Sequence, residues 1–145
     1  MAAQLAGPRV LEEPISARQG ESFKLRAEVR DGAKTAAKPY GAGVEVNAST
    51  IKGVLRIGKP DNTTDLARDT SVAGEGAKAL TAQGTSESLT KDAFDFYVAF
   101  GVTALWAVGL HDFECEFQDT APTVPDRKII LIGRIDVQPK PSDAA

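Results

Sequence analysis

The sequence predicts an all-β protein, an antiparallel β-sandwich of about seven strands. The first observation is a set of short segments in which apolar and polar residues alternate, as they do in strands that bury one face. The second is the placement of Gly, Pro and Asp residues, which separate these segments and favour turns. The third is that the 145 residues contain no internal repeat and no heptads. A single domain of this length can bury a core of its own.

The clearest strand is predicted at residues 22–30, SFKLRAEVR, and Asp31 and Gly32 end it with turn chemistry. Strict alternation over this length is typical of a half-buried strand. We expect the basic residues of its outer face to be matched by acidic neighbours. The inner face carries Phe23, Leu25, Ala27 and Val29, and the outer face carries Lys24, Arg26, Glu28 and Arg30.

Three more strands are predicted in the middle of the chain. VEVNAST and GVLRIG, residues 44–50 and 53–58, form two strands that are split or bulged near Gly53. Residues 93–100, AFDFYVAF, alternate again, and their aromatic content favours strand over helix. The expected inner face of this strand carries Phe94, Phe96, Val98 and Phe100.

The sandwich is expected to span residues 20–139, between two terminal segments that lack strand alternation. Residues 1–19 carry two prolines and predict an extended N-terminal arm, with a short edge strand near Val10 and Leu11. Residues 140–145 are polar and predict a C-terminal tail that leaves the domain surface.

The longest interruption of the strand pattern lies at residues 58–92. This segment is rich in Gly, Ala, Ser, Thr and Asp and poor in large apolar residues, so it predicts a long surface loop. A short helix at residues 75–83 is the one regular element that it could hold. Farther along, residues 101–109 predict a short connector with one helical turn, in which Trp106 plugs the core.

The stretch GLHDFECEFQDTAPTVPDRKIILIGRIDV, residues 109–137, predicts a β-hairpin. DFECEFQ and KIILIGRIDV both alternate, and the eight residues 119–126 between them hold two prolines and form the loop. Pairing the strands about this loop brings apolar residues together on one face, and each cross-strand pair stabilises by about 0.2–1 kcal/mol. The predicted neighbours are Phe117 with Ile129, Cys115 with Leu131, Asp112 with Arg134, and Gln118 with Lys128.

His111 and Cys115 are the only histidine and the only cysteine of the chain, and the hairpin predicts a structural role for both. Cys115 falls on the apolar face, where a buried thiol is inert. His111 stands beside Asp112, and a His–Asp dyad is the functional alternative. However, the sequence holds no G-x-S-x-G nucleophile motif to complete such a dyad. We therefore predict no catalytic residue.

Two other patterns suggest ligands but fit structural roles better. GEGAKA, Gly74–Ala79, has the glycine spacing of a dinucleotide-binding turn, yet no βαβ unit surrounds it. The carboxylates of residues 112–116 suggest calcium, but alternate residues of a strand spread along a solvated face, whereas calcium needs about six to eight converging oxygens. The sequence thus predicts no cofactor-binding residue, no metal ligand, no cofactor and no enzyme.

Composition excludes several classes of partner. The net charge of -3 and the pI of about 5.2 argue against nucleic acid and anionic membranes, because both need a basic patch. A single cysteine cannot form an internal disulfide. The first residues lack the pattern of a signal peptide, and no apolar run approaches the roughly 18 residues of a membrane helix. We therefore expect a soluble protein made in a reducing cytosol.

Four segments of the chain follow the order of a known domain. GESFKLRAEVRDG, Gly20–Gly32, enters an alternating strand, and KPYGAGVEVNAS supplies a Pro-containing turn before a second strand. Near the end, Thr103, Leu105 and Gly109 precede the aromatic and acidic strand HDFECEF, and ILIGRIDVQP forms a closing strand. This order resembles the immunoglobulin-like N-terminal domain of phage baseplate upper proteins and related domains of other tailed-phage structural proteins.

The resemblance covers roughly residues 20–57 and 92–139 and implies an immunoglobulin-like sandwich in a tailed-phage virion. It implies a non-catalytic structural protein, either a tail or baseplate adaptor or a capsid decoration, made in the host cytoplasm and assembled into the virion. The implied partners are other virion structural proteins and repeated copies of the chain itself, with no nucleic acid and no membrane. The terminal arms and the 58–92 loop would dock onto a repeated lattice, and strand addition at an exposed edge is one route.

Two alternatives belong to other functional classes. A carbohydrate-binding module on the same sandwich needs an exposed aromatic platform, for which Tyr40, Tyr97 and Trp106 are the candidates. An enzyme needs converging catalytic residues, and one histidine and one cysteine without a motif do not supply them.

Overall fold

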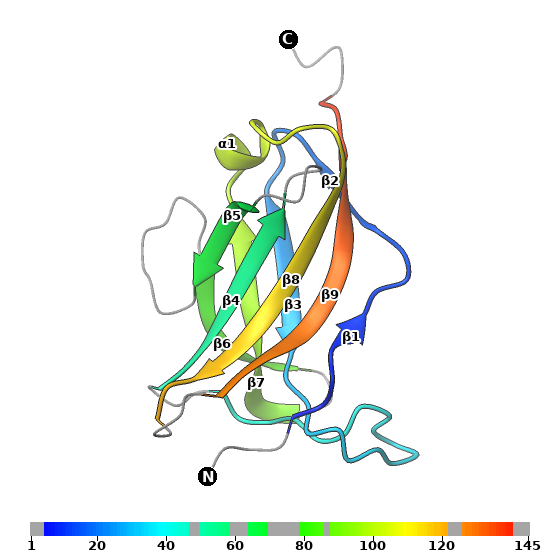
Figure 1. Cartoon of the computed structure of the whole chain (residues 1–145), viewed down its shortest axis with the longest axis vertical. Coiled ribbons are helices and arrows are strands. Elements are labelled where there is room, and N and C mark those ends of the chain that lie inside the picture. Colours follow the sequence, from blue (N-terminus) through cyan, green and yellow to red (C-terminus); the bar gives the residue numbers. More distant parts are fainter. Residues whose placement is uncertain are drawn as a thin grey trace.

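The computed structural model describes residues 5–46, 50–58, 64–69, 79–85, 88–121 and 126–140, and every structural statement below concerns these residues. They form a protein made mostly of β-strands, with a single one-turn helix (Figure 1). The elements are β1 (Arg9–Val10), β2 (Ile15–Arg18), β3 (Phe23–Glu28), β4 (Ile51–Gly58), β5 (Thr64–Asp69), β6 (Ala79–Thr85), β7 (Ser88–Val98), α1 (Phe100–Thr103), β8 (Gly109–Asp119) and β9 (Asp126–Gln138).

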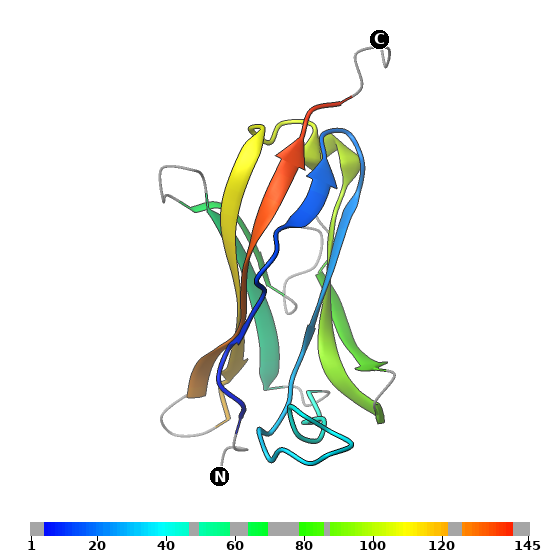
Figure 2. The same ribbon diagram turned by 90° about the vertical axis from the view of Figure 1, so that its right-hand side faces the viewer.

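The strands form two sheets that face each other, as Figure 2 shows edge-on. The larger sheet has the order β1-β9-β8-β4-β5, and β2 pairs with β9 beside β1. The smaller sheet has the order β3-β7-β6. Pairs within the sheets are antiparallel, except that β1 and β2 both run parallel to β9. This confirms the predicted β-sandwich, with nine strands among the described residues rather than about seven.

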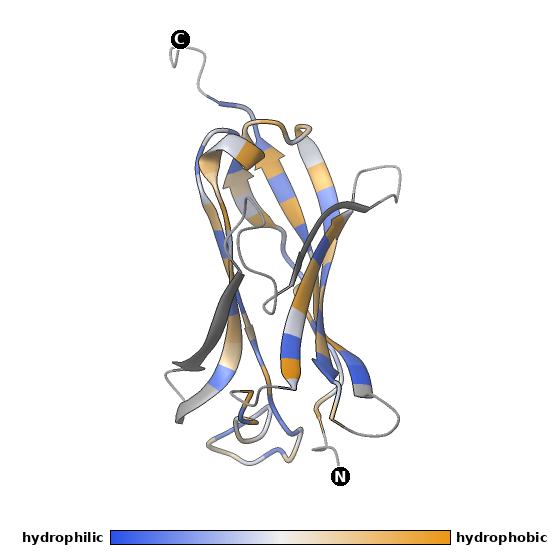
Figure 3. Cartoon of the chain, turned by 90° about the vertical axis from the view of Figure 1, so that its left-hand side faces the viewer, coloured by the Kyte–Doolittle hydropathy of each residue, from blue (hydrophilic) through white to orange (hydrophobic). Residues whose placement is uncertain are grey.

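The core lies between the two sheets and follows the alternation of the sequence. In β3 every second side chain is buried and those between are exposed or half-buried, and Figure 3 shows this alternation as orange and blue bands along the strands. Trp106 fills one end of the core, as predicted, with its ring edge-on to Phe23 at 5.8 Å between centroids. Among the most deeply buried large side chains are Phe94, Phe96, Leu55, Ile57, Ile135 and His111.

The predicted hairpin is present as β8 and β9. Cys115 lies opposite Leu131 and Asp112 lies opposite Arg134, as predicted. Beyond Cys115 the register shifts by one, and the bulge leaves Ile130 without an opposite residue on β8. A bulge adds one residue to one strand, so every later pair moves by one position. The predicted pairs Phe117 with Ile129 and Gln118 with Lys128 are therefore wrong: the structure pairs these β8 residues with Lys128 and Arg127.

The middle of the chain departs from the prediction in two places. Residues 44–46 form no strand: Gly43 makes an isolated bridge to Arg30 and Val44 N donates to Val29 O at 3.0 Å, while Gly43 lies against the buried Asp92. The predicted loop at 58–92 contains β5, β6 and the start of β7, so the loop prediction is wrong for those residues. The backbone can complete a sheet edge without large apolar side chains. The predicted helix at 75–83 is replaced by strand from residue 79, and residues 75–78 lie outside the described part.

Two more corrections concern the ends of the pattern. The predicted arm at residues 1–19 contains the expected edge strand at β1, but it also contains β2, and both pair with β9. Leu5 and Ala17 are buried in the core, so this segment belongs to the sandwich. Phe100, predicted to face inward, is exposed, because β7 ends at Val98 and α1 turns the chain. Of the predicted tail at 140–145, only residue 140 lies in the described part.

Candidate functional site

His111 is buried, and both of its ring nitrogens lie within hydrogen-bond distance of backbone carbonyl oxygens. Nδ1 lies 3.0 Å from the carbonyl oxygen of Gly58, and Nε2 lies 2.7 Å from that of Ala107. These contacts tie the end of β4 to the connector that leads into β8. Asp112 is exposed and pairs across the strands with Arg134. His111 therefore makes its contacts with carbonyl oxygens and not with the neighbouring carboxylate, which is the arrangement of a structural histidine.

Cys115 lies in the core, level with Leu55 on one neighbouring strand and Leu131 on the other. Its side chain has no exposed surface. Burial raises the pKa of the Cys115 thiol far above its ordinary value, and the negative charge of Glu114 adds to the shift. A thiol that stays protonated is neither a nucleophile nor a metal ligand.

The three aromatic residues considered for carbohydrate binding are not brought together. Trp106 is buried in the core. Tyr97 is half-buried on β7, with the ammonium of Lys24 5.9 Å from its ring centre. Tyr40 is exposed, and the guanidinium of Arg9 lies 4.5 Å from its ring centre. Because Trp106 is unavailable to a ligand, these residues do not form one exposed platform, and the carbohydrate-binding alternative stays a prediction.

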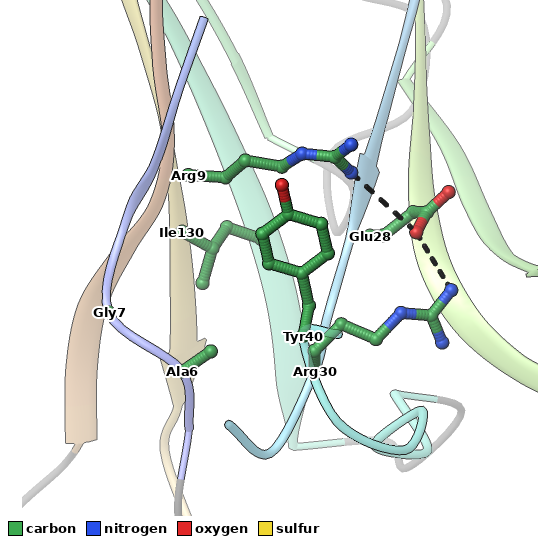
Figure 4. Close-up of a pocket in the computed structure, with 7 residues that line it drawn as sticks. All are labelled: Ala6, Gly7, Arg9, Glu28, Arg30, Tyr40 and Ile130. Carbon is green, nitrogen blue, oxygen red and sulfur yellow. Dashed lines mark hydrogen bonds and ion pairs between the residues drawn. The ribbon is translucent and has the colours of Figure 1, made fainter. Parts of the chain in front are cut away.

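A small cavity lies beneath the ring of Tyr40, where the N-terminal segment passes between the sheets (Figure 4). Its volume is about 30 Å³, which is room for about one water molecule. Ala6, Gly7 and Ile130 line its apolar side, and charged residues line the other. The cavity is too small for a substrate or cofactor.

A chain of alternating charges runs along this cavity into the core. Arg9 lies 4.0 Å from Glu28, Glu28 accepts from Arg30 at 2.7 Å, and Arg30 donates to Asp92 at 2.5 Å. Asp92 is fully buried, and the Arg30 side chain is nearly so. Buried charges persist only when they are paired. The chain therefore fixes the N-terminal segment and β3 to β7, and it confirms that Arg30 has acidic neighbours, although Arg30 is buried rather than outward-facing.

Arg26 also has the acidic neighbour that the sequence predicts. Its guanidinium donates two hydrogen bonds to the carboxylate of Asp95, at 2.6 and 2.8 Å. This pair lies on the outer face of the smaller sheet, where the Arg26 side chain is about half exposed. An exposed ion pair of this kind contributes little to stability.

A second charged cluster surrounds Glu116 on the larger sheet. Burial would raise the pKa of Glu116, but hydrogen bonds from Gln118, Arg127 and Arg56 outweigh it and hold the pKa below its ordinary value. The sequence placed Glu116 on a solvated face. Long arginine side chains from both neighbouring strands cover it instead. The cluster holds β4, β8 and β9 together.

Four exposed apolar side chains lie within one short stretch at the end of the sandwich. We call this surface the apolar end: Phe100, Leu105, Val108 and Leu110, which expose 66%, 87%, 54% and 45% of their area. They belong to α1, to the connector that follows it and to the first residues of β8. Because exposed apolar patches mark protein interaction sites, four such side chains so close together in the chain make the apolar end a candidate docking surface.

The backbone beneath the apolar end is held in place by side chains. Thr103 Oγ1 donates to the carbonyl oxygen of Glu21 at 2.7 Å, and Gln19 Nε2 donates to that of Trp106 at 2.6 Å. Together with the contact between His111 and Ala107, these bonds attach α1 and the connector to the turn between β2 and β3 and to β8. The sequence missed this surface because Phe100 continues the alternation of the preceding strand. The run of apolar residues in GVTALWAVGL was the available signal.

The described residues contain no cluster of three or more His, Cys, Asp or Glu side chains that could hold a metal ion. Over the same part of the chain, no helix is both long and apolar enough to cross a membrane.

Comparison with known proteins finds matches among solved structures. No family model matches the chain, and no curated protein matches it. Among solved structures, the CupB6 tip adhesin from Pseudomonas aeruginosa aligns with 96% of this chain at 13% sequence identity and a TM-score of 0.27. The chain spans 42% of the length of that adhesin chain. A likeness this weak carries no argument about fold or function.

Proposed function

We propose that this chain is a non-catalytic structural protein of a tailed-phage virion, an immunoglobulin-like module that docks onto other virion proteins in repeated copies. The observation that carries the docking function is the apolar end, a rigidly held surface of large exposed apolar side chains. Such a surface would serve either a tail or baseplate adaptor or a capsid decoration. The phage context comes from the resemblance of residues 20–57 and 92–139 to virion domains.

The strand order supports an immunoglobulin-like topology. In immunoglobulin variable domains, one sheet contains strands G, F, C and C′ side by side and the other contains strands B, E and D. If β3 is strand B and the following strands take the letters C, C′, D, E, F and G in turn, the two sheets become G-F-C-C′ and B-E-D. This assignment uses every strand from β3 to β9 in chain order and leaves β1 and β2 as the A region.

The apolar end replaces the terminal arm as the proposed docking element. Residues 1–19 were expected to reach out to a lattice, but β1 and β2 are paired with β9 in the same sheet. Large apolar side chains can contribute about 1.5–3 kcal/mol each when a partner buries them fully. Leu105 and Phe100, the two most exposed, are therefore expected to supply much of the binding free energy.

The experiment is immunogold electron microscopy on phage particles purified from a lysate of the source. Label on the heads identifies a capsid decoration, and label at the tail end identifies an adaptor. Particles without label, in a lysate that contains the protein, would overturn the proposal. For the docking surface, Leu105→Glu is expected to lower the amount of protein on particles. Val10→Glu serves as the matched control, because Val10 is also exposed but lies on β1, outside the apolar end.

A further inference from the structure

Among the described residues, one edge of the smaller sheet is open along β3. This strand pairs with β7 on one side, and no other strand among the described residues pairs with it. Val29 N donates to Asp92 O at 2.8 Å and continues the β3–β7 register by one pair. In an antiparallel ladder, alternate residues direct their backbone groups to the same neighbour. The backbone groups of Lys24 and Glu28 therefore point away from β7, toward the open edge.

The open edge borders two grooves that lead toward the core. One groove, of about 260 Å³, lies between β3 and the segment that holds β1, and its floor includes Leu11, Leu25 and Leu131. The other, of about 480 Å³, continues past Ile15 to Phe23. In Figure 2 the two chain segments that border the grooves are β2, in blue, and β3, in light blue. A strand added beside β3 would place alternate side chains over this apolar floor.

The path of the N-terminal segment explains why this edge is open. Ala6 N donates to Arg30 O at 2.8 Å, which covers the edge just beyond the end of β3. The chain then crosses to the other sheet, where β1 pairs with β9 and Leu11 N donates to Ile132 O at 2.9 Å. The same residues cannot pair with both edges at once. Along β3 itself, the position of a neighbouring strand is therefore available to a segment of another protein.

The charges around the grooves indicate what that segment carries. The lining residues include four cations and two carboxylates, and Lys24 and Arg18 form no ion pair within the described residues. Residues opposite Lys24 and Arg26 in an added strand would face outward, where acidic side chains are favoured. Residues opposite Leu25 would face the groove floor, where apolar side chains are favoured.

A second copy fits this edge less well than an acidic segment does. Two β3 strands paired about a two-fold axis at Leu25 set Lys24 against Arg26 twice. An axis at Arg26 sets that residue against itself, although Lys24 then faces Glu28. Like charges placed opposite each other destabilise a pair, whereas an acidic partner strand avoids them in either register. We propose that the edge of β3 accepts an extended segment of a partner protein in which apolar and acidic residues alternate. The proposed strand addition rests on the proposed docking function, because the natural partner would be a virion protein. The binding itself can be tested in solution without virions.

The test uses a peptide of sequence VEVEVEV with acetylated and amidated ends, and VKVKVKV is the control peptide. Each peptide is titrated into the whole protein, and binding is followed by NMR and amide hydrogen exchange. The acidic peptide is expected to shift the amides along β3 and to slow exchange at Lys24 and Glu28 by about tenfold or more, because it bonds to their backbone groups. Lys24→Glu is expected to weaken VEVEVEV binding by about tenfold. Lys34→Glu, an exposed change in the 31–43 loop, is the matched control and is expected to leave binding unchanged.

A second variant tests the edge itself. Lys24→Pro removes an N–H that points away from β7, so it is expected to block the peptide while circular dichroism shows an intact fold. Unchanged exchange at Lys24 and Glu28 with excess VEVEVEV would overturn the proposal, as would equal binding of the two peptides. A dimer by sedimentation that Lys24→Pro dissociates would identify a second copy as the occupant instead. If the peptide binds but particles carry no label, the docking edge stands and the virion role fails.

Discussion

Gly53 of β4 lies directly beneath the ring of Phe94 of β7, so the two sheets touch at a residue without a side chain. A Cβ atom at Gly53 would lie 2.5 Å from Cγ and 2.6 Å from Cδ2 of Phe94. Phe94 also contacts Phe117, at 6.5 Å between ring centres, and Phe117 lies opposite Gly53 in the sheet. The glycine thus forms the slot into which the central aromatic ring of the core fits.

Gly53→Ala is expected to lower the free energy of unfolding by about 1–3 kcal/mol, because the added methyl group overpacks a filled core. The loss of backbone freedom in the unfolded chain offsets this by only about 0.4–1 kcal/mol. Urea denaturation measures the difference. Gly101→Ala is the matched control, because a Cβ at Gly101 of α1 meets nothing within 4 Å. A neutral or stabilising Gly53→Ala would show that Phe94 can move aside.

Asp92→Asn tests the buried end of the charge chain. The substitution keeps the size of the side chain but leaves the positive charge of Arg30 without its fully buried counter-ion. Removing one partner of a buried pair is strongly destabilising, so we expect a loss of about 3 kcal/mol. Asp95→Asn, which breaks the more exposed pair with Arg26, is expected to cost less than about 1 kcal/mol. Equal losses in the two variants would contradict the structural role of Asp92.

The sequence was most informative for strands in which one face is buried and the other is exposed to solvent. Alternation located β3, β7 and the β8–β9 hairpin, and it placed Cys115 opposite Leu131. Alternation reports only which face is buried. It carries no information on an extra residue such as Ile130 in the bulge, and it could not show that the N-terminal segment pairs in parallel with β9.

The missed features have two causes. β5 and β6 each lie at the edge of a sheet, where backbone hydrogen bonds can hold a strand that is poor in large apolar residues. Arg30 was read as outward-facing from the alternation of β3, but the strand ends at Glu28 and the chain then turns inward toward Asp92. The apolar end was missed for a similar reason: Phe100 continues the alternation of β7 in the sequence but lies beyond the end of that strand. Alternation stops being informative where a strand ends, and the apolar end begins at such a point, just after β7.

The thiol of Cys115 is expected to report on unfolding. It has no exposed surface, and its pKa is raised by burial, so a thiol reagent cannot reach a thiolate in the folded protein. Ellman's reagent is therefore expected to react at the rate at which the protein opens, and the rate should increase steeply across the urea transition. Rapid reaction without urea would contradict the packing of the β8–β9 hairpin.

Glu116 is expected to make the protein sensitive to acid. Hydrogen bonds from Gln118, Arg127 and Arg56 hold its pKa below the value of 4.5 that it has in an unfolded chain. The folded state thus binds this proton less readily than the unfolded state does. The resulting stabilisation is present above pH 4.5 and is lost as the pH falls through the lower pKa of the folded state.

Glu116→Gln removes the titrating group and is expected to flatten the fall in stability below pH 4.5, while it costs about 1–2 kcal/mol at pH 7 through weakened hydrogen bonds to two arginines. Thermal unfolding from pH 7 to pH 3 measures both effects. Glu114→Gln is the matched control, because Glu114 is two residues away on the same strand and more exposed. If wild type and Glu116→Gln lost stability equally on acidification, the contribution of the Glu116 cluster would not depend on pH. Other carboxylates would then control the loss of stability.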